Sequence, residues 1–135
     1  MSSPLIQCLH DNHGLPLLDR QTADAFLAEG GECVLFFTGD PERYKETDDV
    51  AVVLPELLKA FGGRLQAGVV AREAERELDE RYGFGVRPAL AFFREGQYLG
   101  AITRMQDWDV YLQRIPEILA GPVAGEQPPV SYQAD

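Results

Sequence analysis

Residues 81–93 read Arg-Tyr-Gly-Phe-Gly-Val-Arg-Pro-Ala-Leu-Ala-Phe-Phe, and this stretch decides the fold. Glycine and proline end a helical pattern within it, and an unbroken apolar run follows directly. That run predicts a strand over 89–94. Glu95-Gly96 is a short turn, and 97–103 has the pattern of another strand. Two strands joined by such a turn are predicted to form an antiparallel hairpin.

Two more strands are predicted upstream of this hairpin. Residues 32–38 form a continuous apolar run rather than an alternating one, which favours a strand buried on both faces in the middle of a sheet. Residues 65–71 form the second run. Between the two, residues 39–49 are polar and are expected to form a loop, whereas 50–61 has a helical pattern that contains a proline and ends at a glycine pair.

Three other segments are predicted to be helical. Residues 71–82 are charged and place apolar side chains four residues apart on one face. Thr22 is the expected N-cap of a helix that ends at Gly30-Gly31. Asp107 is the expected cap of the last helix, which Pro116 should bend. Its apolar stripe predicts core packing for Trp108, Tyr111, Leu112, Ile115, Ile118 and Leu119.

These elements predict an α/β fold with three layers and a single domain over residues 1–120. Counting the apolar segment 15–20 as a first strand, the order is β-α-β-α-β-α-β-β-α. Alternating strands and helices predict a parallel portion of the sheet with helices on both faces, and the hairpin makes the sheet mixed. Residues 121–135 contain three prolines and few large apolar residues, which predicts a flexible Pro-rich tail.

The composition restricts the possible partners. The chain has 135 residues, with 22 acidic side chains against 12 Lys and Arg, a net charge of −10. This excess argues against nucleic acid and anionic membranes, which need clustered cations. It leaves a basic partner open, although net charge also serves solubility alone. No apolar run approaches the ~18 residues of a membrane helix, and the N-terminus lacks the pattern of a secretory signal. A cytoplasmic protein without membrane insertion is expected.

The cysteines do not predict a disulfide or a metal site. Cys8 and Cys33 are the two cysteines, and they do not form a Cys-x-x-Cys motif. Cys33 begins an apolar strand, where a thiol usually packs as a small hydrophobic group. Cys8 lies near His10 and His13, but no second Cys/His pair completes a zinc site, so a polar loop is expected there. We expect no metal and no cofactor.

The ordered set of elements resembles the thioredoxin fold over roughly residues 20–120. In this resemblance Val34-Leu-Phe-Phe is the central strand, Pro55 lies at the kink of the following helix, and Pro88 is the cis-proline before the hairpin. The redox Cys-x-x-Cys would fall on Thr47-Asp-Asp-Val50, and the buried acid of the family's enzymes would fall on Phe36. Thiol–disulfide exchange needs an exposed thiolate. Disulfide oxidoreductase activity is therefore not expected, while the peptide-binding groove beside the cis-proline could remain.

In more detail the chain resembles the HyaE/HupG family of hydrogenase expression/formation proteins. The resemblance is carried by Val86-Arg-Pro-Ala-Leu-Ala-Phe-Phe-Arg-Glu-Gly-Gln-Tyr-Leu-Gly-Ala-Ile and by Gln106-Asp-Trp-Asp-Val-Tyr-Leu. It implies a non-catalytic chaperone that takes part in maturation of [NiFe] hydrogenases. The implied partner is the small-subunit precursor with its twin-arginine signal, together with other assembly factors.

A partner site is predicted where the acidic loop meets the proline-bordered groove. A basic segment joined to an apolar one could be attracted by the loop and sheltered by the groove. The loop acids are Asp40, Glu42, Glu46, Asp48 and Asp49, and Pro88 and its neighbours would make the contact. The alternative is that these acids form a solvated surface loop. Arg87 either pairs with one of these acids or points into solvent.

Two other functions remain open from the sequence. The first is a thiol enzyme that uses Cys33 or Cys8 alone, which requires an exposed thiol with a lowered pKa. The second is a scaffold or oligomerisation module of the same fold, which is favoured if Pro88 is trans or if side chains fill its groove.

Overall fold

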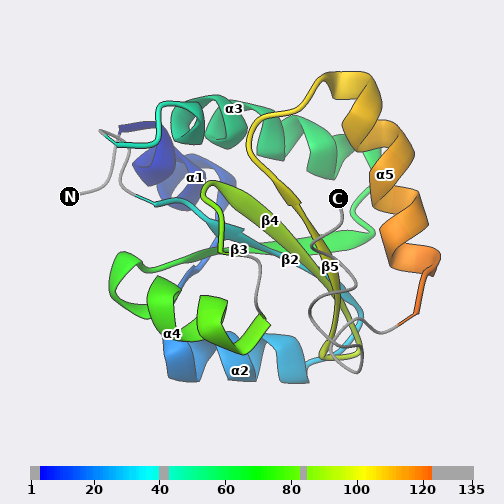
Figure 1. Cartoon of the computed structure of the whole chain (residues 1–135), viewed down its shortest axis with the longest axis horizontal. Helices are drawn as coiled ribbons and strands as arrows, with labels where there is room; N and C mark the ends of the chain where they lie inside the picture. The colour runs from blue at the N-terminus through cyan, green and yellow to red at the C-terminus, as the bar shows by residue number, and fades with distance from the viewer. Residues whose placement is uncertain (1–3, 40–42, 83–84, 123–135) are drawn as a thin grey trace.

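Figure 1 shows a computed structural model of the chain, which describes residues 4–39, 43–82 and 85–122. A five-stranded sheet forms the middle layer, in the order β1-β3-β2-β4-β5. The strands are β1 (Leu17–Leu18), β2 (Glu32–Phe37), β3 (Leu65–Val70), β4 (Ala89–Arg94) and β5 (Gln97–Thr103). β3 pairs in parallel with β1 and β2, whereas β4 is antiparallel to β2 and β5. The predicted mixed sheet and its hairpin are confirmed.

Helices cover both faces of this sheet (Figure 1). α1 (Pro4–His13), α3 (Glu46–Ala60) and α5 (Trp108–Ala120) lie on one face, and α2 (Arg20–Ala28) and α4 (Arg72–Tyr82) lie on the other. Each face has its own cluster of buried apolar side chains. The predicted three-layer α/β architecture is confirmed. From residue 123 onward, the predicted tail lies outside the described residues.

Strand β2 joins the two halves of the core. Val34 and Phe36 pack into the cluster on the α3 face, and Cys33, Leu35 and Phe37 pack into the cluster on the α4 face. All five side chains are almost completely buried. Burial on both faces explains why the run is continuously apolar instead of alternating.

The N-terminal segment is a helix, and the expectation of a polar loop around Cys8, His10 and His13 was wrong. α1 places Ile6 and Leu9, three residues apart, in the core cluster that also contains α3. The Leu15 N–H donates to the Leu9 carbonyl at 3.1 Å and ties the following turn to the helix. Two apolar contacts therefore dock a helix whose other side chains are mostly exposed.

The N-cap of helix α2 lies three residues before the predicted one. Asp19, not Thr22, is its N-cap. The Asp19 carboxylate accepts from the Thr22 N–H at 2.8 Å, and the Asp19 N–H donates to the Thr22 hydroxyl at 2.7 Å. This reciprocal pair is a capping box, with Thr22 in the N3 position.

Helix α3 also begins earlier than predicted, so the expected loop over 39–49 was wrong for its last four residues. Glu46, Asp48 and Asp49 lie in the first turn, where acidic side chains stabilise the positive end of the helix dipole. The buried Thr47 hydroxyl donates to the Thr38 carbonyl at 2.5 Å, which fixes this turn against the end of β2.

Trp108 does not pack in the core as predicted. Its side chain is 41% exposed, and Leu112, one turn further along α5, is 38% exposed. Tyr111, Ile115 and Leu119, spaced four residues apart, make the buried contacts instead. The stripe of α5 is therefore wider than the face that meets the sheet.

Candidate functional site

A groove with a cavity of about 510 Å³ lies at the end of the sheet where β2 finishes and β4 begins. Three separate segments line it: the approach to α3, the loop before β4 and the loop after β5. The lining residues are Arg43, Tyr44, Lys45, Glu46, Gly85, Val86, Arg87, Pro88 and Arg104. The thioredoxin-like topology thus brings together segments far apart in sequence.

Pro88 forms the floor of this groove. The peptide bond between Arg87 and Pro88 is cis, as the resemblance implied. The Pro88 carbonyl accepts from the Arg104 N–H at 2.7 Å, which joins the second and third walls. Val86 is 40% exposed and adds an apolar side chain to the rim. Pro88 is thus cis and the groove is open, so neither condition that would favour a scaffold is met.

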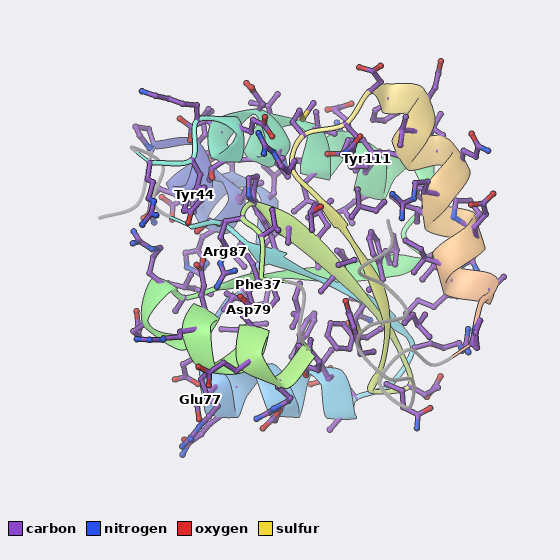
Figure 2. All side chains as sticks on the ribbon, viewed as in Figure 1. Phe37, Tyr44, Glu77, Asp79, Arg87 and Tyr111 are labelled. Carbon is purple, nitrogen blue, oxygen red and sulfur yellow. The ribbon has the colours of Figure 1, made fainter. Side chains whose placement is uncertain are left out.

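Arg87 pairs with two carboxylates of α4. Its Nε donates to Glu75 at 3.2 Å and its Nη1 donates to Asp79 at 2.6 Å. All three side chains are largely buried, and the guanidinium lies over the Phe37 ring at 5.9 Å (Figure 2). Burial disfavours the charged form of Arg87, but Asp79 and Glu75 outweigh it and raise the pKa of the guanidinium.

Glu75 connects the end of β2 with the loop before Pro88. Its carboxylate accepts from the Thr38 N–H at 2.9 Å, the Thr38 hydroxyl at 3.0 Å and the Gly39 N–H at 3.0 Å. The same carboxylate accepts from Arg87 on the other side. Asp79 adds a bond from the Gly85 N–H at 2.8 Å. Two carboxylates of α4 thereby hold the end of β2 and the loop before Pro88 in one arrangement.

The predicted loop acids are not gathered into one cluster among the described residues. Asp40 and Glu42 lie outside the described residues. Glu46 lines the groove, where Arg104 at 3.1 Å and the Met105 N–H at 2.8 Å hold its carboxylate. These bonds, that of Arg104 first, lower the pKa of Glu46. Asp48 is half-buried and Asp49 is exposed on the first turn of α3.

The described thiols are unsuited to redox chemistry at this groove. Thr47 and Val50, which take the positions of the redox pair, are both buried in α3. Cys33 is 1% exposed in β2, and Cys8 lies on α1 as a free cysteine. Burial, followed by the charges of Glu29 and Glu95, raises the pKa of Cys33. A thiol with a raised pKa is a poor nucleophile.

Thiol labelling should therefore distinguish the two cysteines. At mildly alkaline pH we expect one thiol, Cys8, to react rapidly with a disulfide reagent in the native protein, whereas Cys33 reacts only after unfolding. Cys8→Ser should remove the fast phase and leave the slow one. Rapid native labelling of Cys33 in that variant would revive the single-cysteine enzyme.

The described residues include no group of three or more His, Cys, Asp or Glu side chains placed to hold a metal ion. None of the described helices is long and apolar enough to cross a membrane.

The sequence analysis missed Glu75 and Asp79. Glu75 occupies the apolar stripe of α4 together with Ala74 and Leu78, which are both buried. A carboxylate on a core-facing stripe is a signal for a buried partner. The partner itself, Arg87, could not be identified from this periodicity because it lies beyond the end of the helix.

Comparisons with known proteins identify relatives along almost the whole chain. The sequence profile of the family described as "Hydrogenase-1 expression protein HyaE" matches residues 5–111. The hydrogenase expression/formation protein HoxO of Azotobacter vinelandii is 49% identical over 121 residues, covering 90% of this chain and 81% of the relative. HupG of Bradyrhizobium diazoefficiens is 47% identical over 119 residues, covering 84% and 80%.

The chain is also similar to proteins of known structure. The crystal structure of a hydrogenase expression/formation protein hupG from Rhodopseudomonas palustris CGA009 is 50% identical, with a TM-score of 0.56, and covers 78% of this chain and 95% of that one. A thioredoxin mutant from Halobacterium salinarum NRC-1 is 18% identical, with a TM-score of 0.63, and covers 81% and 92%. The latter similarity supports the fold alone.

Proposed function

The chain belongs to the HyaE family of hydrogenase expression/formation proteins, and we propose that it acts as a non-catalytic chaperone for the precursor of the [NiFe] hydrogenase small subunit. In this proposal the precursor, through its twin-arginine signal, docks at the groove beside Pro88. Other hydrogenase assembly factors are further candidate partners.

One observation carries the proposal: the groove beside the cis-proline is open, while the positions of the redox pair hold Thr47 and Val50. A fold that keeps the binding surface and lacks the thiols there is suited to hold a polypeptide without reacting with it. The network around Glu75 holds the groove walls in place, which lowers the entropy cost of binding.

The charge pattern supports an approach by a basic segment. The net charge of −10 attracts cationic partners over distances comparable to the Debye length. Asp48 and Asp49 share the first turn of α3 with the groove-lining Glu46, and we propose that they supply the local field together with Asp40 and Glu42. Glu46 and Arg87 are already paired within the protein, so we assign them the role of shaping the groove beside Pro88.

Neutralising the double acid on α3 tests this assignment. Asp48→Asn/Asp49→Asn should weaken binding of a synthetic twin-arginine signal peptide roughly three- to tenfold at low salt, because one half-buried and one exposed attractive charge are lost. Isothermal titration measures the affinity. Glu73→Gln/Glu80→Gln is the matched control, since it removes the same charge from α4 on the other face of the sheet. Unchanged affinity in the Asp48/Asp49 variant would contradict the local field.

The precursor itself provides the broader test. The tagged full chain, expressed in cells that carry a hydrogenase operon, should recover the small-subunit precursor, and deletion of the signal should abolish this recovery. Recovery that is independent of the signal would contradict the proposed docking element. Failure to recover the precursor at all would contradict the chaperone role.

A further inference from the structure

We propose that the groove beside Pro88 binds an extended polypeptide segment that carries carboxylate side chains. This inference rests on the proposed function only in that the occupant is a polypeptide. It concerns the groove itself, which differs in charge from the chain as a whole.

The described lining of the groove is cationic in an acidic protein. Its charged members are four cations, Arg43, Lys45, Arg87 and Arg104, and one carboxylate, Glu46. The whole chain, in contrast, has a net charge of −10. One third of all Lys and Arg residues, four of 12, line this single groove. Such local concentration favours an anionic occupant, because a groove with low-dielectric walls focuses the field of its charges.

Internal pairs account for only half of these cations. Arg87 is held by Glu75 and Asp79, and Arg104 is held by Glu46. Within the part of the chain that the structure describes, neither Arg43 nor Lys45 forms an ion pair, and both are exposed. Their charges are thus available at the mouth of the groove.

Tyr44 is an anchored aromatic residue that lies between these two cations in the sequence. Its half-buried ring packs so closely against Gly39 that a Cβ there would approach it to 2.6 Å. The Arg43 guanidinium lies over the same ring at 5.5 Å, and the Tyr44 carbonyl accepts from the Thr47 N–H at 3.1 Å. The anchored ring therefore positions the Arg43 guanidinium beside the groove that both residues line.

Among the residues that the structure describes, none forms an ion pair with Lys45 that would explain its charge. It is the N-cap of α3, a position that favours side chains able to accept a hydrogen bond, and its side chain makes no capping bond. A cation at the N-terminus of a helix is also disfavoured by the helix dipole. An incoming carboxylate would be attracted by Lys45.

The shape of the groove favours an extended segment over a free ion. Its lining includes the exposed Val86 side chain and the Pro88 ring beside the cations. A segment that alternates carboxylate and apolar side chains would contact both kinds of surface. The arginines of a twin-arginine signal would be repelled by Arg43 and Lys45, so they would lie outside the groove, nearer to Asp48 and Asp49, when the signal docks.

Short dye-labelled peptides titrated against the full chain test this inference. One peptide carries two glutamates among Thr and Val residues, a second has both replaced by glutamine, and a third has both replaced by lysine. We expect the glutamate peptide to bind tightest by fluorescence anisotropy at low salt, and Arg43→Gln/Lys45→Gln to weaken it roughly three- to tenfold. Arg72→Gln/Arg76→Gln, on exposed positions of α4, is the matched control and should leave the affinity within a factor of about two.

Each of the following outcomes would overturn the inference. Equal binding of the glutamine peptide would show that carboxylates are not recognised, and equal losses in both double variants would show that only overall charge matters. Displacement of the peptide by inorganic phosphate at a matching concentration would identify a simple anion site. The proposed chaperone role is tested separately, by recovery of the precursor. The groove can select carboxylates even if no precursor is recovered, and the precursor can still be recovered by a variant in which Arg43 and Lys45 are neutralised.

Discussion

Glu75→Ala should lower the free energy of unfolding by about 3–5 kcal/mol, whereas Glu77→Ala, two residues further along α4, should lower it by less than about 1 kcal/mol. The two carboxylates belong to the same helix and differ in what surrounds them. Glu75 is 5% exposed, and Glu77 pairs with Arg20 where both side chains are about half exposed.

The difference follows from what each deletion leaves unpaired. Without Glu75, the buried N–H groups of Thr38 and Gly39 lose their acceptor, and Arg87 loses one of its acidic partners in a desolvated site while it keeps Asp79. Each unsatisfied buried donor costs roughly 1–3 kcal/mol, and a partly unpaired buried charge costs more. Removal of Glu77 leaves Arg20 in water, where its guanidinium is solvated.

Urea unfolding followed by circular dichroism measures both values. Glu75→Gln is the informative intermediate, since its amide carbonyl can still accept one hydrogen bond while the charge facing Arg87 is lost. The decrease in the free energy of unfolding caused by Glu75→Gln should fall between the decreases caused by Glu75→Ala and Glu77→Ala. Glu75→Ala within about 1 kcal/mol of Glu77→Ala would contradict a structural role for the network.

Local pattern was sufficient for most of the fold. The continuous apolar runs that became β2 and β4 and the turn at Glu95-Gly96 are short-range signals, and the structure confirms each of them. Helix α1 was missed because only Ile6 and Leu9 are buried, too few for a recognisable stripe. The starts of α2 and α3 were misplaced because polar residues such as Asp19 and Glu46 serve helices and loops equally well in a sequence.

The site was less predictable because its chemistry depends on tertiary contacts. Pro88 could be placed by resemblance, since its position before the hairpin is a local feature. The partners of Arg87 could not, because Glu75 and Asp79 reach it only after α4 packs beside β2. Acids close to each other in sequence were grouped as one loop, although Glu46 and Asp49 face different surroundings on a helix.

Phe36→Asp should abolish folding at neutral pH, and Phe36→Ala should cost about 3–5 kcal/mol. This is the position where, by resemblance, redox-active relatives of the fold carry a buried acid. Here Phe36 is 0% exposed, and its neighbours across the sheet are Val69 and Leu90, at 2% and 1%. A carboxylate would lie among apolar side chains and would carry the desolvation penalty in addition to the lost packing.

The combined loss for Phe36→Asp approaches the ~5–15 kcal/mol by which a typical domain is stable, so we expect an unfolded or insoluble product. Phe36→Leu is the matched control and should cost no more than about 2 kcal/mol, because it keeps an apolar side chain in the same cluster. Circular dichroism and urea titration of the three variants separate these outcomes. A folded Phe36→Asp protein with near-native stability would show that position 36 can accept a buried acid. The expected unfolding would show instead that the apolar packing around Phe36 does not accept a carboxylate. Introducing redox chemistry into this chain would then require changes to the core around Phe36 as well as thiols at positions 47 and 50.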